Sequence, residues 1–90
     1  MNHLLVSYDL IAPGRNYESI RGFLESHVNW AKPVQSLYLV KANKTAESLR
    51  NELNAYLDTN DKVIVVDVTK DAAAWKGLSD QISSWIKANI

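Results

Sequence analysis

The alternation of apolar and polar residues along the chain predicts strands at the beginning, in the middle and near the end. Residues 3–11 are rich in apolar and aromatic side chains and lead into a Pro-Gly turn, which is typical of a strand. The segments 34–42 and 62–69 have the same β character. Pro33 confines the entry of the middle segment to a sheet edge or a bend. We expect this segment to form one strand, or two short strands joined by a kink near Ser36.

Helical spacing of apolar residues predicts three helices. The first covers Asn16 to Val28, and Asn16 can cap its first turn. Thr45 and Ser79 are suited to cap the second and third helices. The predicted apolar faces comprise Tyr17, Ile20, Phe23, Leu24 and Val28 in the first helix, Leu49, Leu53, Tyr56 and Leu57 in the second, and Ile82, Trp85, Ile86 and Ile90 in the third.

This order of elements predicts one α+β domain over residues 1–90. With the middle segment divided, the order is βαββαβ with an extra C-terminal helix, which is a ferredoxin-like sandwich. Its core is expected over residues 1–69, and a linker and the C-terminal helix over residues 70–90. We expect the first and third strands to be parallel neighbours at the centre and the last strand to pair antiparallel with the first. The alternative is a three-stranded βαβαβα sheet with right-handed crossovers.

Both faces of the last predicted strand are largely apolar. One face carries Ile64, Val66 and Val68, and the other carries Val63, Val65 and Asp67. We expect the second face to be covered, either by the C-terminal helix or by the sheet of a second copy. A chain of this length buries only about 60% of its unfolded surface, which favours a homodimer. The predicted dimer interface consists of Leu5, Ser7, Val63 and Val65.

Composition narrows the possible functions. The 90 residues contain ten Lys and Arg against ten Asp and Glu, so the chain lacks the overall positive charge that attracts a protein to bare duplex DNA. The absence of cysteine excludes disulfides, thiolate zinc sites and cysteine nucleophiles. The apolar run near the amino terminus is too short for a signal sequence or a membrane span. We expect a soluble cytoplasmic protein without membrane association.

Three aspartates are expected near one edge of the sheet. Asp9 ends the first strand, and Asp58 and Asp61 lead into the last strand. Carboxylates of this kind can hold magnesium, with Asp9 and Asp61 as ligands and Asp9 as the catalytic group, especially if a dimer supplies a second set. The alternative is that Asp58 and Asp61 shape a turn and that Asp9 accepts hydrogen bonds from the following loop.

Basic residues are predicted at the same edge as Asp9. Arg15, Lys41 and Lys44, with the amino termini of the first two helices, are candidates for binding phosphate; the alternative is a solvated rim of charges. His3 and His27 are expected at the opposite end, so a histidine general base beside the aspartates is not predicted. The tryptophans and tyrosines are expected to pack in the core or an interface rather than to stack on bases.

Two short motifs carry a resemblance to a known family. Val6-Ser7-Tyr8-Asp9-Leu10 and Val34-Gln35-Ser36-Leu37-Tyr38 resemble the CRISPR-associated Cas-two family and the SinR-like and VapD-like small proteins grouped near it. The likeness covers residues 1 to about 69. It implies a ferredoxin-like homodimer joined through its sheet faces, with the aspartate matching Asp9 near the dimer axis.

The resemblance implies two alternative functions. Some members are assigned a magnesium-dependent nuclease activity that uses this aspartate, and others act as a dimeric bridge that holds DNA. The family usually has a run of basic residues after the aspartate, whereas this chain has only Arg15 there, and its final helix is closer to the SinR-like group. We therefore expect a homodimeric binding or scaffold protein associated with nucleic acid and without catalytic activity. The alternative is a magnesium-dependent phosphodiesterase that uses Asp9 from both subunits.

Overall fold

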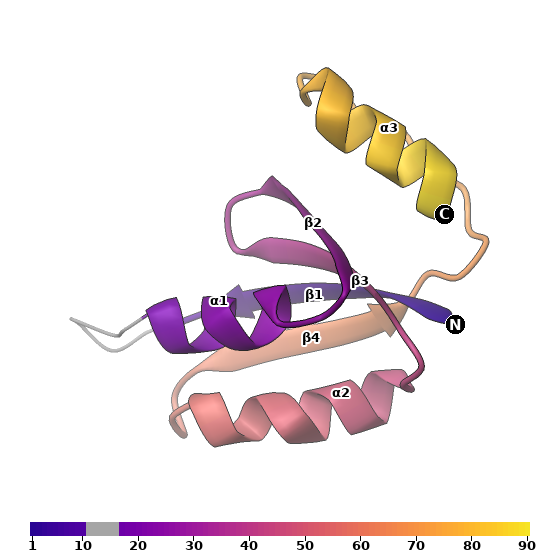
Figure 1. The fold of residues 1–90 in the computed structure, drawn as a ribbon. Coiled ribbons are helices and arrows are strands. Elements are labelled where there is room, and N and C mark those ends of the chain that lie inside the picture. Colours follow the sequence, from indigo (N-terminus) through magenta and orange to yellow (C-terminus); the bar gives the residue numbers. More distant parts are fainter. Residues whose placement is uncertain (11–16) are drawn as a thin grey trace.

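The structure is a computed structural model that describes residues 1–10 and 17–90 (Figure 1). It contains a four-stranded sheet and three α-helices, which confirms the α+β class and the βαββαβ order with an extra C-terminal helix. The elements in chain order are β1 (Asn2–Asp9), α1 (Tyr17–Glu25), β2 (Asn29–Val34), β3 (Leu37–Ala42), α2 (Ala46–Leu53), the 3₁₀ turn η1 (Asn54–Tyr56), β4 (Lys62–Asp67) and α3 (Asp80–Asn89).

The sheet is antiparallel throughout and has the strand order β2-β3-β1-β4. The pairing of β4 with β1 is as predicted, with Asp9 opposite Lys62 and Leu4 opposite Asp67. The prediction that the first and third strands are parallel is wrong, because Asn2 of β1 lies opposite Ala42 of β3. The connection through α1 brings the chain back to the start of the sheet, so that β2 runs in the same direction as β1. The tight turn after β2 then reverses the direction of the chain. The second strand of this hairpin, β3, must therefore run antiparallel to β1.

The middle β segment is divided at Gln35-Ser36, as the second of the two sequence interpretations expected. Its first half begins earlier than predicted, at Asn29, and forms the edge strand β2. Pro33 lies in this edge strand, where the register with β3 shifts between Ala31 and Val34. Ser36 has a φ of 58°, so the turn holds a non-glycine residue in the left-handed region.

Side-chain caps fix where two of the helices begin. Thr45 accepts a hydrogen bond from the backbone N–H of Ser48 at 3.0 Å, and Ser79 accepts one from Ile82 at 3.1 Å, as the sequence predicts. Helix α1 ends at Glu25 rather than at Val28. Val28 is consequently fully exposed, and its predicted place on the apolar face of α1 is wrong.

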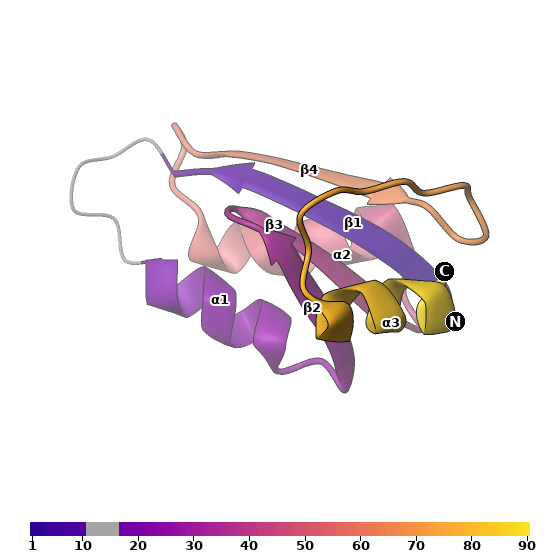
Figure 2. The ribbon, with the colours of Figure 1, turned by 90° about the horizontal axis from the view of Figure 1, so that it is seen from above.

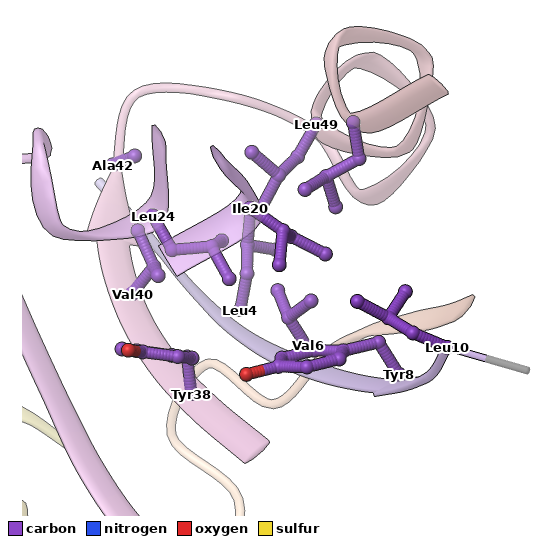
Figure 3. Packing of buried hydrophobic residues seen from close by; sticks show 11 residues of the cluster. Leu4, Val6, Tyr8, Leu10, Ile20, Leu24, Tyr38, Val40, Ala42 and Leu49 are labelled. Atoms are coloured by element: carbon purple, nitrogen blue, oxygen red, sulfur yellow. The ribbon is translucent and has the colours of Figure 1, made fainter. Parts of the chain in front are cut away.

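The main core lies between one face of the sheet and the helices α1 and α2. Alternate residues of β1 point to this face, and Figure 3 shows their side chains meeting those of the helices. Leu49 and Leu53 of α2 are completely buried there. The buried cluster comprises Leu4, Val6, Tyr8, Leu10, Ile20, Leu24, Tyr38, Val40, Ala42, Leu49 and Leu53.

Helix α3 lies on the other face of the sheet, away from α2 (Figures 1 and 2). It packs beside β2, and its Ile86 is buried. We call this side of the sheet the open face; it carries Leu5, Ser7, Val34, Leu37, Leu39, Ile64 and Val66. In the part of the chain that the structure describes, no helix has the length and apolar character to cross a membrane.

Candidate functional site

Asp9 lies at the end of the sheet where β1 finishes and β4 begins. Its register partner is Lys62, the residue after Asp61, so Asp9 and Asp61 share one end of the sheet as predicted. The Asp9 side chain is exposed, and beside it is a depression of about 210 Å³ that Ser7, Lys62 and Ile64 help to line. The two histidines lie at the opposite end, since His3 pairs with Lys41 and His27 contacts Lys44. The prediction that no histidine base accompanies Asp9 is therefore consistent with the sheet register.

Asp58 and Asp61 form a local turn. The Asp61 carboxylate accepts a hydrogen bond from the backbone N–H of Asp58 at 2.8 Å, and the Asp61 N–H donates to the Asp58 carbonyl at 3.1 Å. This matches the alternative reading of these residues as turn formers. Within residues 1–10 and 17–90, no group of three or more His, Cys, Asp or Glu side chains is placed to hold a metal ion. Magnesium binding by Asp9 and Asp61 thus stays a prediction.

Two of the predicted phosphate-binding residues, Lys41 and Lys44, do not lie at the Asp9 edge. Because β3 runs antiparallel to β1, Lys41 lies opposite His3, and the backbone carbonyl of Lys44 accepts from Asn2 Nδ2 at 2.9 Å. The amino termini of α1 and α2 consequently lie at opposite ends of the sheet (Figure 1). The prediction that the two helix termini lie at one edge of the sheet is wrong, because it required β1 and β3 to run parallel. Arg15 lies outside the described residues.

The Lys44 side chain contacts three other side chains at its own end of the sheet. Its Nζ lies 3.0 Å from a carboxylate oxygen of Glu52 and 2.9 Å from Nε2 of His27. It also lies 5.5 Å from the centroid of the Phe23 ring. The Glu52 carboxylate offsets the lysine charge. The contacts of Lys44 with Glu52 and His27 link α2 to the segment after α1.

The four residues of the predicted dimer interface lie on two different faces. Val63 and Val65 are half-buried and pack against the core, because they pair with Tyr8 and Val6 of β1. An intrachain cover of these valines was one of the two expected outcomes, although the cover is the main core and not the C-terminal helix. Leu5 and Ser7 lie on the open face.

The open face is apolar and only partly covered. Ile64 and Val66 of β4 remain 59% and 41% exposed, respectively, and Val34 at the far edge is 51% exposed. Between the sheet and the C-terminal segment runs an apolar groove with a volume of about 410 Å³. Its walls include Leu5, Leu37 and Leu39 of the sheet, and Trp75, Ile86 and Ile90 of the C-terminal segment.

Polar contacts fasten α3 over the start of β1. The indole N–H of Trp85 donates to Asn29 Oδ1 at 2.7 Å, and Asn29 Nδ2 donates to Asn89 Oδ1 at 2.9 Å. The Trp85 ring meets the His3 ring edge-on, with centroids 5.1 Å apart. These contacts join residues more than fifty positions apart, and neither helical periodicity nor a sequence motif signals them.

His3 is buried beneath α3, with 2% of its surface exposed. Neither of its ring nitrogens has a hydrogen-bond partner of normal geometry among the described residues. Burial lowers the pKa of His3 below its ordinary value, and the charge of Lys41 acts in the same direction. The backbone of Asn89 opposes this shift more strongly than Lys41 supports it, and the Asp67 carboxylate opposes it weakly, but burial outweighs both.

A polar pocket that no sequence pattern predicts lies beside α1. Tyr8, Arg21, Lys32, Gln35 and Ser36 line a cavity of about 440 Å³. The residues come from β1, α1, β2 and the turn before β3, so only the tertiary structure brings them together. The one available sequence signal is the i, i+4 spacing of Arg21 and Glu25 on α1.

Comparison of the chain with models of known families, with curated proteins and with solved structures found no match.

Acidification is expected to destabilise the protein through His3. In the pH window below about 6.5, the unfolded chain binds a proton at His3 that the native state does not, because the native pKa is lower. The contribution of His3 to the free energy of unfolding is therefore complete above that pH and declines as the pH falls toward the native pKa. Urea unfolding at about pH 7.5 and about pH 5.5 measures the loss.

The variant His3→Leu tests this origin. It removes the titrating ring but keeps an apolar side chain beside Trp85, so its loss of stability on acidification should be smaller than that of the parent. An equal loss in both proteins, or an imidazole of His3 that titrates in NMR at or above its ordinary pKa, would contradict the assignment.

Proposed function

We propose that this protein is a non-catalytic binding or scaffold protein that works as a homodimer joined through the open face of its sheet. The observation that carries the proposal is the exposure of Ile64 and Val66 beside the apolar groove under α3. These side chains project from β4, so they form part of a continuous apolar surface with Leu5 of β1. Contiguous apolar patches of this kind on small domains commonly mark protein interfaces.

A second copy is a suitable cover for this surface. Fully burying a Val or Ile side chain contributes about 1.5–3 kcal/mol, and a two-fold dimer buries each such residue twice. A 90-residue chain is also near the size at which a single core gives only marginal stability. Association through the open face would add a second apolar layer without disturbing the core between the sheet and the helices α1 and α2.

The resemblance of the Val6–Leu10 and Val34–Tyr38 motifs to the Cas-two family supports both the dimer and an association with nucleic acid. The zero net charge favours weak, local binding, because a strong attraction to nucleic acid needs an excess of basic residues. The hydrogen bonding of Asp61 within its own turn favours binding over metal-dependent catalysis, since a phosphodiesterase needs several oxygen ligands to position its metal and water.

Replacing Val66 by Lys should break the dimer. The parent is expected to sediment at twice the 10.1 kDa mass of the chain. Val66→Lys places a charge in the interface from both copies, so the dissociation constant should rise by at least about tenfold. Sedimentation velocity over a range of concentrations measures the change.

Val28→Lys is the matched control, because Val28 is fully exposed after α1 and makes no part of the open face. It should leave the dimer intact. A parent that remains monomeric at all concentrations, or a dimer that Val28→Lys weakens as much as Val66→Lys does, would refute the proposed interface.

The purified protein is expected not to cleave single- or double-stranded DNA or RNA in magnesium or manganese. Binding to the same labelled strands should be weak and should fade steeply as salt is added. Gel assays with the parent and Asp9→Ala test this directly. Cleavage by the parent that disappears in a folded, dimeric Asp9→Ala variant would establish the nuclease alternative in place of the scaffold.

A further inference from the structure

We propose that the polar pocket between α1 and the β2–β3 hairpin binds the terminal phosphate of a phosphate monoester. The pocket is lined by Tyr8, Arg21, Lys32, Gln35 and Ser36 and has a volume of about 440 Å³. This is large enough to admit a phosphate group together with part of the molecule that carries it. The proposal does not depend on dimer formation.

Two cations from separate elements face this pocket. Arg21 comes from α1, and Lys32 comes from the edge strand β2. None of the described residues that line the pocket is acidic. Glu25, which lies outside the lining, offsets part of the Arg21 charge at 3.9 Å, so the pocket keeps an excess of positive charge that comes chiefly from Lys32 and favours an anion.

Lys32 has no carboxylate within ion-pair distance among the described residues. Its Nζ lies above the Tyr38 ring, 6.0 Å from the ring centroid. This contact holds the side chain on the helix side of the sheet, where Tyr38 is buried. All three N–H donors of the ammonium group thus remain available to an anion.

Neighbouring side chains position Arg21 and leave part of its N–H donors available. Its Nε lies 3.9 Å from the Glu25 carboxylate, and its side chain is 50% exposed. The Tyr38 hydroxyl donates a hydrogen bond to the same carboxylate, so Glu25 is shared between the two groups. Burial, followed by this hydrogen bond, raises the pKa of Tyr38 and keeps the phenol neutral. Glu25 and Tyr38 therefore position the guanidinium without occupying its whole fork of donors.

Neutral polar groups complete the pocket. The backbone N–H of Tyr8 donates to the Ser36 carbonyl at 3.1 Å, which ties the hairpin turn to β1. The Tyr8 and Tyr38 rings stack with centroids 6.4 Å apart, and their hydroxyl oxygens point the same way in Figure 3. Ser36 and Gln35, which carry a hydroxyl and an amide, also line the pocket. The left-handed φ of Ser36 sets the direction of this turn.

This arrangement suits a tetrahedral phosphate better than a planar carboxylate. A carboxylate is satisfied by one guanidinium fork, whereas the lining of this pocket brings two cations and neutral polar residues from four separate segments of the chain. A phosphate monoester offers three acceptor oxygens and a charge of nearly two at neutral pH. The same group can come from a small phosphorylated molecule or from the phosphorylated end of a nucleic-acid strand.

The pocket is independent of the proposed dimer interface. Lys32 lies over Tyr38 on the side of the sheet that carries α1, whereas Ile64 and Val66 lie on the open face. A monomeric protein would therefore still bind phosphate, and a dimeric protein that does not bind phosphate would refute only this inference.

Titration of the full chain with inorganic phosphate, followed by amide and side-chain NMR shifts, tests the proposal. The shifts should center on Arg21, Lys32 and the Gln35-Ser36 turn. Arg21→Gln and Lys32→Gln should each weaken binding by about tenfold or more, which is the usual effect of losing a charge-assisted hydrogen bond. Binding of a phosphate monoester should also weaken as the pH falls below about 6, where the ester loses its second charge.

Matched controls are Arg50→Gln and Lys87→Gln, which remove exposed cations from α2 and α3. Neither should change the affinity. Lys32→Gln is the more informative site variant, because Lys32 makes no hydrogen bond to another described side chain and its loss should leave the fold intact. No saturable shift at the pocket, or equal affinity in the parent and both site variants, would overturn the proposal.

Comparison of different ligands distinguishes the two possible sources of the phosphate group. A nucleoside monophosphate reports on small molecules, and a short strand with a 5′-phosphate is compared with the same strand ending in a 5′-hydroxyl. Tighter binding of the phosphorylated strand than of the monophosphate supports a strand end, and the reverse supports a small molecule. Equal binding of the two strands, weakened alike by Arg21→Gln and Lys32→Gln, would refute the monoester in favour of internal phosphodiesters.

Discussion

Strand β1 pairs with β3 on one side and with β4 on the other, and both partners run antiparallel to it. This double pairing fixes which residues share a face, because side chains alternate along a strand and register partners point the same way. Leu4, Val6 and Tyr8 build the core with α1 and α2, while His3, Leu5 and Ser7 point to the other side. The pairing of β1 therefore determines which residues form the open face and where α3 packs. It also determines where Asp9 and the lysines lie.

The open face divides into a part that α3 covers and a part that stays exposed. Over the start of β1, α3 is anchored by Trp85 and Asn29 and buries His3. Over β4 the sheet remains apolar and exposed at Ile64 and Val66. A second copy that covers the exposed part would complete the apolar layer over the open face, of which the C-terminal segment forms one part. The polar pocket of Arg21 and Lys32 belongs to the other side, so the proposed phosphate binding and the proposed association use different surfaces.

Features set by neighbouring residues could be predicted from the sequence. Thr45 and Ser79 cap their helices through contacts three residues away, and the break near Ser36 reflects local turn chemistry. Features set by long-range pairing could not be predicted so well. Strand direction decided whether Lys41 and Lys44 approach Asp9, and register decided that Val63 and Val65 face the core. Neither the pocket at Arg21 nor the anchor at Trp85 has a local pattern, because each joins distant segments.

The central claim is that two copies meet through the open face. Isotope-filtered NOE spectra of a mixture of labelled and unlabelled protein test it most directly, because they report only contacts between copies. The account predicts contacts between copies from the methyl groups of Ile64 and Val66, and none from Val28, which is exposed elsewhere. Contacts between copies that arise from the surfaces of α1 and α2 but not from Ile64 and Val66, or no such contacts at all, would contradict it.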